Sequence, residues 1–294
     1  MAKRQAAEPP LRRSCGAMAA YMALLESKPS FRAAQARLEG ATERQRSRVA
    51  PKAWSPVTIK VIVHVVYKVA AENISDAQIK GQIKVLNHDF RATNPDKAKT
   101  PVPWKGLVAD TGINFVLHKV VRTATRQGPF TWDDKVKKTA SGGVPPVQPT
   151  KYLNMWVCAL SGGLLGYTQF PGGPPATDGV VINYRAFGTT GTAQAPFNKG
   201  RTATHEIGHY LNLRHIWGDT PGCGGSDLVA DTPNCADANT GKPVWPVVTC
   251  NNGPNGDMFM NYMDYTDDAA MFMFTSQQVT RMQAALTTQR SGLT

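Results

Sequence analysis

Residues 204–215, which read Thr-His-Glu-Ile-Gly-His-Tyr-Leu-Asn-Leu-Arg-His, constrain the fold more than any other stretch of the chain. Side chains four residues apart lie on one face of a helix, so His205 and His209 can direct two imidazoles to one point. His215 lies six residues after His209, about 600° around a continuing helix at roughly 100° per residue, and therefore on the wrong face. The chain must turn before His215. Asn212 suits that turn, because Asn tolerates the left-handed conformation that ends many helices.

Imidazoles that meet at one point are a typical ligand set for zinc. A catalytic zinc ion takes three protein ligands and leaves its fourth position to water. Glu206, directly after the first histidine, is placed to act as a general base on that water. The chain has six histidines, half of them in this segment, and no Glu follows Glu206. Zinc peptidases with a downstream glutamate ligand are thereby excluded, which leaves His205, His209 and His215 as ligands; the alternative is a surface helix with two histidines.

The motifs around this site resemble the pappalysin family of metzincin metallopeptidases, especially its ulilysin-like and cytophagalysin-like microbial members. The resemblance covers nearly the whole chain and rests on residues 205–215, 216–219, 231–233 and 252–275. The family often has Gly where this chain has Asn212, and Asn makes the same turn. The resemblance implies an α+β fold of the metzincin-type zincin class. Its upper lobe is a twisted mixed β-sheet with backing and active-site helices, and its loop-rich lower lobe carries a Met-turn and a C-terminal helix.

Residues 1–50 differ in composition from the rest of the chain, because they are rich in Ala and Arg and poor in strand-forming residues. We expect a helical pro-segment here and a catalytic domain at residues 51–294, with the upper lobe at about 51–212 and the lower lobe at about 213–294. The polar, Arg-rich stretch that ends this segment suits an exposed processing site. We expect the activating cut near Arg46 or Arg48.

Residues 12–18 resemble the family's pro-segment motif, in which a cysteine occupies the open zinc position. Cys15 is therefore the candidate latency residue. A thiolate is a good zinc ligand and would displace the catalytic water. The alternative is an incidental free thiol.

The resemblance also assigns roles to three residues near the C-terminus. Met263 is expected beneath the three histidines, and Tyr265 is expected to stabilise the oxyanion. Asp268 aligns with the carboxylate on the floor of the primed-side specificity pocket, which favours a bidentate Arg side chain and Lys more weakly. The resemblance thus implies cleavage on the amino side of Arg. The alternatives are a packed aromatic for Tyr265 and a solvated turn residue for Asp268.

Cys223 and Cys250 match one of the family's disulfides. They bracket a loop in the lower lobe, closing a ring of the size for which about 3 kcal/mol of stabilisation is typical. Disulfides persist in oxidising compartments, so this pair fits a secreted protein.

Asp227 and Thr232 lie in a loop that resembles the family's calcium site. Calcium takes six to eight oxygen ligands, which carboxylates, a hydroxyl and backbone carbonyls can supply. We therefore expect a structural Ca²⁺ ion beside the catalytic Zn²⁺. A metal-free acidic loop is the alternative.

Hydrophobic periodicity predicts the elements of the upper lobe. Val57–Tyr67 is almost unbroken in β-branched residues and indicates a buried strand. Ser75 and Gln78 form a possible capping box before a helix, and Gln278 could close a second capping box, after Thr275, at the start of a C-terminal helix. Further strands are expected at 113–121, 152–160, 164–170 and 180–187. One of these strands should border the cleft and bind substrate by β-augmentation, and the sequence does not indicate which.

The net charge of +12 raises the question of nucleic-acid binding. Residues 1–50 hold ten Lys or Arg and four Glu, so half of the excess lies in the first sixth of the chain. We expect no nucleic-acid partner, because no basic stripe with interleaved aromatics is present. No stretch approaches about 20 consecutive apolar residues, so no membrane span is expected. The apolar run at residues 16–25 fits a short helix better than a signal peptide, and no export signal is evident.

Together these features predict a monomeric, secreted zinc metalloendopeptidase made as a latent precursor, with protein or peptide substrates. The alternative is a non-catalytic zinc-containing adhesion or binding protein. Structural zinc sites are normally closed by four protein ligands, so a three-histidine site with an adjacent Glu argues against that alternative.

Overall fold

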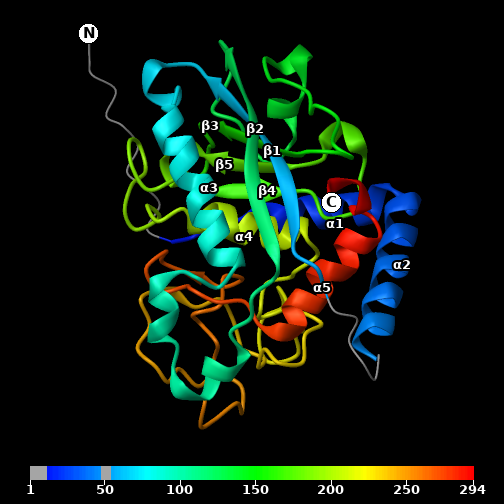
Figure 1. Cartoon of the computed structure of the whole chain (residues 1–294), viewed down its shortest axis with the longest axis vertical. Helices are drawn as coiled ribbons and strands as arrows, with labels where there is room; N and C mark the ends of the chain where they lie inside the picture. The colour runs from blue at the N-terminus through cyan, green and yellow to red at the C-terminus, as the bar shows by residue number, and fades with distance from the viewer. Residues whose placement is uncertain (1–11, 48–53) are drawn as a thin grey trace.

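The upper part of the molecule is a five-stranded sheet in the order β2-β1-β3-β5-β4 (Figure 1). The computed structural model describes residues 12–47 and 54–294. β1, β2, β3 and β5 run parallel and β4 is antiparallel to β5 at one edge. Crossover connections bury both faces of such a sheet, which explains the continuous apolar runs in its strands. The strands are β1 (Val57–Tyr67), β2 (Ile113–Ala124), β3 (Leu153–Cys158), β4 (Gly166–Thr168) and β5 (Val180–Asn183).

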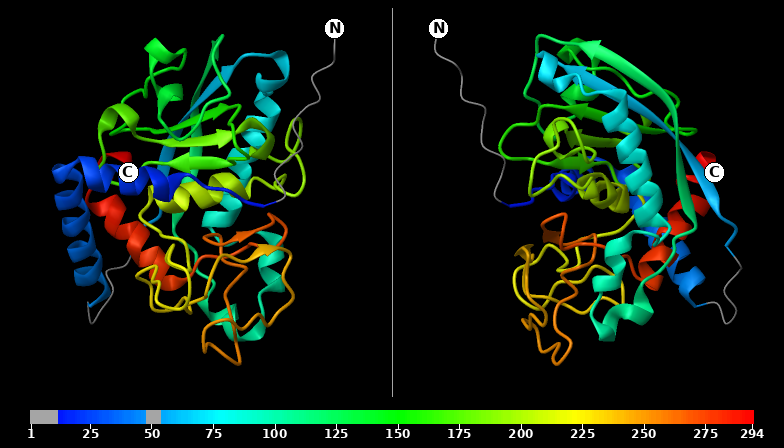
Figure 2. Two further views of the ribbon diagram at one scale, coloured as in Figure 1. Left: turned by 180° about the vertical axis from the view of Figure 1, so that it is seen from behind. Right: turned by 60° about the vertical axis from the view of Figure 1, so that its left-hand side comes forward.

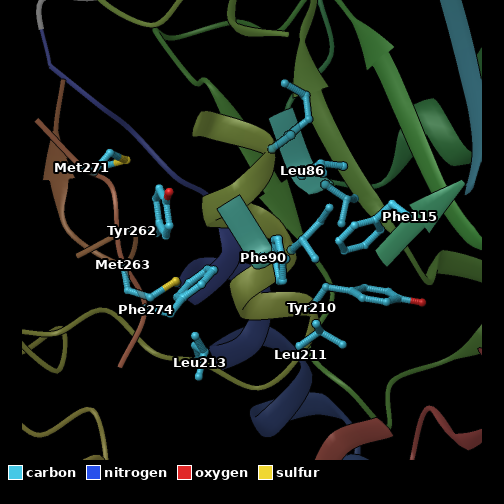
Figure 3. Close-up of a cluster of buried hydrophobic side chains, with 14 of the residues drawn as sticks. Leu86, Phe90, Phe115, Tyr210, Leu211, Leu213, Tyr262, Met263, Met271 and Phe274 are labelled. Carbon is cyan, nitrogen blue, oxygen red and sulfur yellow. The ribbon is translucent and has the colours of Figure 1, made fainter. Parts of the chain in front are cut away.

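Helices α3 (Asp76–Phe90) and α4 (Arg201–Tyr210) pack on the sheet. Half of the predicted capping box is present, since the Ser75 hydroxyl accepts a hydrogen bond from the backbone N–H of Gln78 at 3.2 Å. The Gln78 side chain does not complete the box and donates instead to the carbonyl of Phe187 at 2.8 Å. Figure 3 shows apolar side chains from several elements gathered around α4, which they fix between the sheet and the lower lobe. Phe90 illustrates this packing, because its ring lies 5.1 Å from the ring of Phe274.

The lower lobe is mostly loop. It contains the short parallel pair β6 (Thr240–Gly241) and β7 (Tyr265–Thr266) and ends in α5 (Ser276–Thr287). The predicted capping box is complete at the start of α5, where Thr275 and Gln278 exchange backbone-to-side-chain hydrogen bonds. Short 3-10 helices lie at Ala70–Glu72, Pro95–Lys99, Val102–Leu107, Lys135–Lys137, Thr139–Ser141, Pro175–Thr177, Tyr184–Ala186 and Ser291–Leu293.

Two helices precede the sheet in the sequence and pack against the rest of the chain. α1 (Ala17–Ser27) contacts β4, and α2 (Pro29–Arg46) lies along α5 (Figure 2). The close approach of α2 requires Gly172, because a Cβ atom there would lie 2.7 Å from Cβ of Ala34. Arg46 is the last residue of α2, whereas Arg48, the other expected processing position, lies outside the described residues.

The expected strand at 180–187 is too long. β5 stops at Asn183, whose side chain accepts a hydrogen bond from the N–H of Arg185 at 3.1 Å and so starts a 3-10 turn. Side-chain hydrogen bonds of this kind compete with strand pairing. The strand expected at 164–170 is likewise shortened to β4. Among the described residues, no helix combines the length and apolarity that crossing a membrane requires.

Candidate active site

The three histidines converge as their spacing predicts. His205 and His209 lie on α4, and Asn212 follows with φ +76°, the left-handed conformation that turns the chain back. The backbone N–H of Leu213 then donates to the carbonyl of Gly208 at 2.9 Å and closes the helix. The Nε2 atoms of His205, His209 and His215 lie 3.0 to 3.2 Å from one another.

Each histidine is oriented through its other ring nitrogen. Nδ1 of His205 lies 2.7 Å from the carbonyl of Tyr262, and Nδ1 of His209 lies 2.8 Å from the carbonyl of Leu213. Nδ1 of His215 lies 2.6 Å from a carboxylate oxygen of Asp219. Since all three partners are acceptors, each Nδ1 carries the hydrogen and each Nε2 lone pair faces the shared point. The orienting role of Asp219 was missed by the sequence analysis.

This arrangement fits zinc. Ligands at about 2.0–2.1 Å from a tetrahedral Zn²⁺ lie roughly 3.3 Å from each other, close to the spacing of these Nε2 atoms. Burial and the neighbouring imidazoles hold the pKa of His205 and of His209 well below the usual range. Both rings are therefore neutral, the form that binds a metal ion.

Glu206 lies beside the histidines with its side chain almost fully buried. Its Oε2 atom has no hydrogen-bond partner among the described residues. Burial raises the pKa of Glu206 to about 8, opposed by a hydrogen bond from Cys15 and by the charge of Arg13. A zinc ion nearby would also oppose this rise, because a cation favours the carboxylate. Gly166 on β4 makes room for Glu206, since a Cβ atom there would lie 2.9 Å from Cγ and Oε1 of the glutamate.

Met263 and Tyr265 both lie next to the histidines. Met263 is fully buried against Gly208, where a Cβ atom would lie 2.4 Å from the methionine Sδ atom. The ring of Tyr265 lies 4.8 Å from that of His215. Its hydroxyl donates a hydrogen bond to the carbonyl oxygen of Cys15 at 3.5 Å. The structure therefore places a phenol donor beside a backbone carbonyl at the histidine cluster.

Cys15 completes a cluster with the histidines. Its Sγ atom and the ligand nitrogens of His205, His209 and His215 all lie within 4.8 Å of one another. The surrounding backbone pairs with β4, because the N–H of Gly16 donates to the carbonyl of Gly166 at 2.9 Å and the N–H of Leu165 donates to the carbonyl of Ser14 at 2.9 Å. β4 is thus the strand that pairs with the N-terminal segment beside the histidines.

Asp268 binds Arg13, a residue that lies 255 positions away and had no role in the sequence analysis. The guanidinium donates to Oδ1 of Asp268 at 2.6 Å, and the two side chains are only 1% and 0% exposed. It also donates to the hydroxyl of Thr202 at 3.0 Å and to the carbonyl of Thr266 at 3.2 Å. The guanidinium lies 5.1 Å from the ring centre of Phe197. Asp268 is therefore buried in an ion pair with Arg13 and is not a solvated turn residue.

The lower lobe holds the other predicted residues. Cys223 and Cys250 form a disulfide, and the remaining three cysteines are free. Oδ2 of Asp227 accepts a hydrogen bond from the hydroxyl of Thr232 at 2.7 Å, so the two candidate calcium ligands lie together. Burial raises the pKa of Asp227 to about 7, against the hydrogen bond from Thr232.

Comparison with known proteins identifies the class to which this site belongs. The peptidase family described as pregnancy-associated plasma protein-A matches residues 145–287, which include all three histidines. An extracellular metalloprotease of Pyricularia oryzae is 35% identical over 248 residues, which are 81% of this chain and 78% of that protein. The chain belongs to the pappalysin family and is a metalloendopeptidase. Membership of this family implies a catalytic zinc, which the histidine cluster fits.

Two solved structures are particularly similar. A mutant of promirolysin from Tannerella forsythia has a TM-score of 0.87 and 43% sequence identity, covering 96% of this chain and 97% of that chain. Mature mirolysin of the same organism in complex with a cleaved peptide has a TM-score of 0.78 and 46% identity, covering 82% of this chain and 99% of that chain. The predicted fold class and family are confirmed. The alternative of a non-catalytic zinc protein is not supported.

Proposed function

We propose that this chain is the latent precursor of a secreted, monomeric zinc endopeptidase that cleaves peptide bonds on the amino side of Arg, with Lys accepted more weakly. Residues 1–50 act as the pro-segment and residues 51–294 as the catalytic domain. The observation that carries the proposal is the buried pair of Arg13 and Asp268 beside a cysteine that faces the three histidines.

The way Asp268 is held supports the proposed selectivity for arginine. Its Oδ2 atom accepts hydrogen bonds from the backbone N–H groups of Lys199 at 2.7 Å and Arg201 at 3.2 Å. These donors lie at the start of α4, where the helix dipole also favours a negative charge. Oδ1 is left to face the incoming side chain. A fixed, buried carboxylate with further acceptors around it suits the five donors of a guanidinium better than a lysine ammonium.

The residues around the histidines can divide the steps of hydrolysis among them. Zn²⁺ bound there would polarise the scissile carbonyl and lower the pKa of the attacking water. Glu206 accepts the proton of that water and delivers it to the leaving nitrogen. The hydroxyl of Tyr265 donates a hydrogen bond to the carbonyl oxygen as negative charge develops, as it now does to the carbonyl of Cys15.

Latency follows if the pro-segment occupies the places that substrate needs. Cys15 faces the metal position, Arg13 fills the pocket of Asp268, and the backbone at residues 14–16 uses the edge of β4. The match to promirolysin supports this proposal, because it covers 96% of the chain whereas the match to mature mirolysin covers 82%.

A structural calcium ion in the lower lobe is a further part of the proposal. Asp227 and Thr232 would supply two of its oxygen ligands. We expect added calcium to raise the melting temperature of the wild-type chain and to leave that of Asp227→Asn unchanged. Equal shifts in the two proteins would place calcium elsewhere.

Mass spectrometry of a digested peptide library tests the proposed activity. The processed wild-type protein should produce fragments that begin with Arg, and Glu206→Ala should produce none. Asp268→Asn should lower the enrichment of Arg about a hundredfold, since removal of one partner of a buried ion pair costs about 3 kcal/mol or more. Asp267→Asn removes the neighbouring charge and serves as the matched control. Cleavage without a preference for Arg would reject the role of Asp268, and no cleavage at all would reject the proposed enzyme.

A further inference from the structure

A second side chain of the N-terminal segment lies in a built site on the rest of the chain. The Tyr21 side chain on α1 is almost fully buried, at 5% exposure of the residue. Its ring centre lies 4.7 Å from that of Phe170, with an angle of 53° between the planes. The guanidinium of Arg214 lies 5.5 Å from the same ring and donates a hydrogen bond to the Tyr21 hydroxyl at 3.2 Å. The phenol is thus recognised at its face and at its hydroxyl.

This site borders the metal-binding histidines. The ring of Phe170 lies 5.4 Å from that of His209, and Arg214 directly precedes His215. Along the N-terminal segment, Arg13 enters the pocket of Asp268, Cys15 faces the histidines and Tyr21 follows. The site for Tyr21 therefore lies on the side of the histidines away from Asp268.

We propose that Phe170 and Arg214 form a subsite that binds an aromatic side chain of the substrate, with a preference for Tyr over Phe. The inference rests on the proposed function, because removal of residues 1–50 must free the site. α1 rises about 1.5 Å per residue, whereas an extended substrate advances about 3.3 Å per residue. The distance spanned between Cys15 and Tyr21 thus corresponds to about two to four extended residues. Since the Arg that follows the cleaved bond binds Asp268, a side chain on the opposite side of the histidines belongs to a residue before the bond. The preferred aromatic residue is therefore expected two to four residues before the cleaved bond.

Arg214 makes the subsite selective as well as apolar. Stacking on Phe170 and the cation–π contact favour any aromatic ring. Only Tyr can also accept the hydrogen bond from Arg214, and this bond is worth about 1 kcal/mol or more. The second wall of the present site is Phe31 on α2, 5.6 Å from Tyr21, and it leaves with the pro-segment. The opened site therefore has room for a side chain that is presented by an extended peptide.

The test compares cleavage-site profiles of the wild type, Arg214→Gln and Arg126→Gln after processing of each full chain. Arg126 is an exposed arginine on the surface, so its substitution makes the same change in charge. In the wild type and Arg126→Gln we expect Tyr to be enriched over Phe about fivefold, two to four residues before the cleaved bond. In Arg214→Gln this ratio should fall to about one, while fragments still begin with Arg.

A second measurement uses the intact precursor and does not depend on the folding of an Arg214 variant. Tyr21→Ala should speed the appearance of activity, Tyr21→Phe should do so less, and Met22→Ala, on the exposed face of α1, should match the wild type. Cleavage before Arg with equal use of Tyr, Phe and aliphatic residues at these positions would overturn the subsite and leave the proposed function standing. Equal activation of Tyr21→Ala and Met22→Ala would also overturn it. No cleavage by any protein would refute the proposed function and the subsite together.

Discussion

Substitution of Arg13 by Ala removes the contact that should hold the N-terminal segment most firmly. The variant loses the ion pair to Asp268 at 2.6 Å, two further hydrogen bonds and the contact with Phe197. It also leaves the carboxylate of Asp268 without its cationic partner. Breaking a buried pair in this way costs about 3 to 5 kcal/mol, and both side chains are too buried for solvent screening to reduce that figure much. The lower figure corresponds to more than about a hundredfold weaker binding of the segment.

The assay follows activity in the purified full-length chain before and during processing. A fluorogenic peptide with Arg after the scissile bond reports the initial rate, and gel electrophoresis follows the length of the chain. We expect Arg13→Ala to show activity before any cut and to process about a hundredfold faster than the wild type. Arg12→Ala is the matched control, because Arg12 is the exposed neighbour with the same charge.

Arg13→Lys separates charge from shape. Lysine restores the positive charge without the planar fork of donors, so this variant should lie between the wild type and Arg13→Ala. If Arg13→Ala and Arg12→Ala activated at the same rate as the wild type, the pair with Asp268 would not contribute to latency. Asp268 would then not be preorganised for arginine.

Three further changes test other parts of the site. Gly166→Ala should lower kcat of the processed enzyme strongly and leave its metal content unchanged, because the added Cβ atom would lie 2.9 Å from the Glu206 side chain. Loss of the metal from this variant would contradict the prediction. Gly208→Ala should lower the free energy of unfolding by about 1 to 3 kcal/mol, because the added Cβ atom overpacks against Met263. Denaturant titration measures this change, and an unchanged free energy of unfolding would show that the methionine can move. Partial burial tends to raise the pKa of Glu39, but its pairing with an arginine on α5 outweighs burial and lowers this pKa below the usual 4.5. The contribution of Glu39 to docking of the segment is therefore present above pH 4.5 and is lost as acid protonates the carboxylate. Precursor activation should therefore accelerate below that pH in the wild type, and Glu39→Gln should activate faster at neutral pH with a weaker dependence on acid.

The parts of the site that the sequence predicts are those encoded over a few residues. The turn at Asn212 follows from the spacing of the histidines, and the left-handed φ of this residue agrees with the prediction. The caps at Ser75 and Thr275 are likewise local, because the bonding groups lie three residues apart. Such short-range patterns leave few alternatives once helical periodicity is given.

The parts that could not be predicted depend on long-range packing. Nothing near Arg13 in the sequence indicates that it binds Asp268, and nothing in the short β4 marks it as the edge of the sheet. Asp219 becomes an orienting group only after the chain has folded back towards His215. The strand expected at 180–187 is too long for a different reason. The Asn183 side chain accepts a hydrogen bond from the backbone two residues later, and a turn forms there in place of strand pairing.

The N-terminal segment is held at several separate places, and this has a consequence for activation. Arg13 pairs with Asp268, and Cys15 faces the histidines. Tyr21 packs on Phe170, and the carboxylate of Glu39 accepts hydrogen bonds from Arg281 at 2.7 and 2.8 Å. All these contacts lie before Arg46 in the sequence, so the cut that we propose would leave every one of them intact. The cut changes only the effective concentration of the segment, from the millimolar range typical of tethered groups to its concentration in bulk solution. Activation should therefore be completed by dissociation and dilution, and degradation of the released segment would make it irreversible.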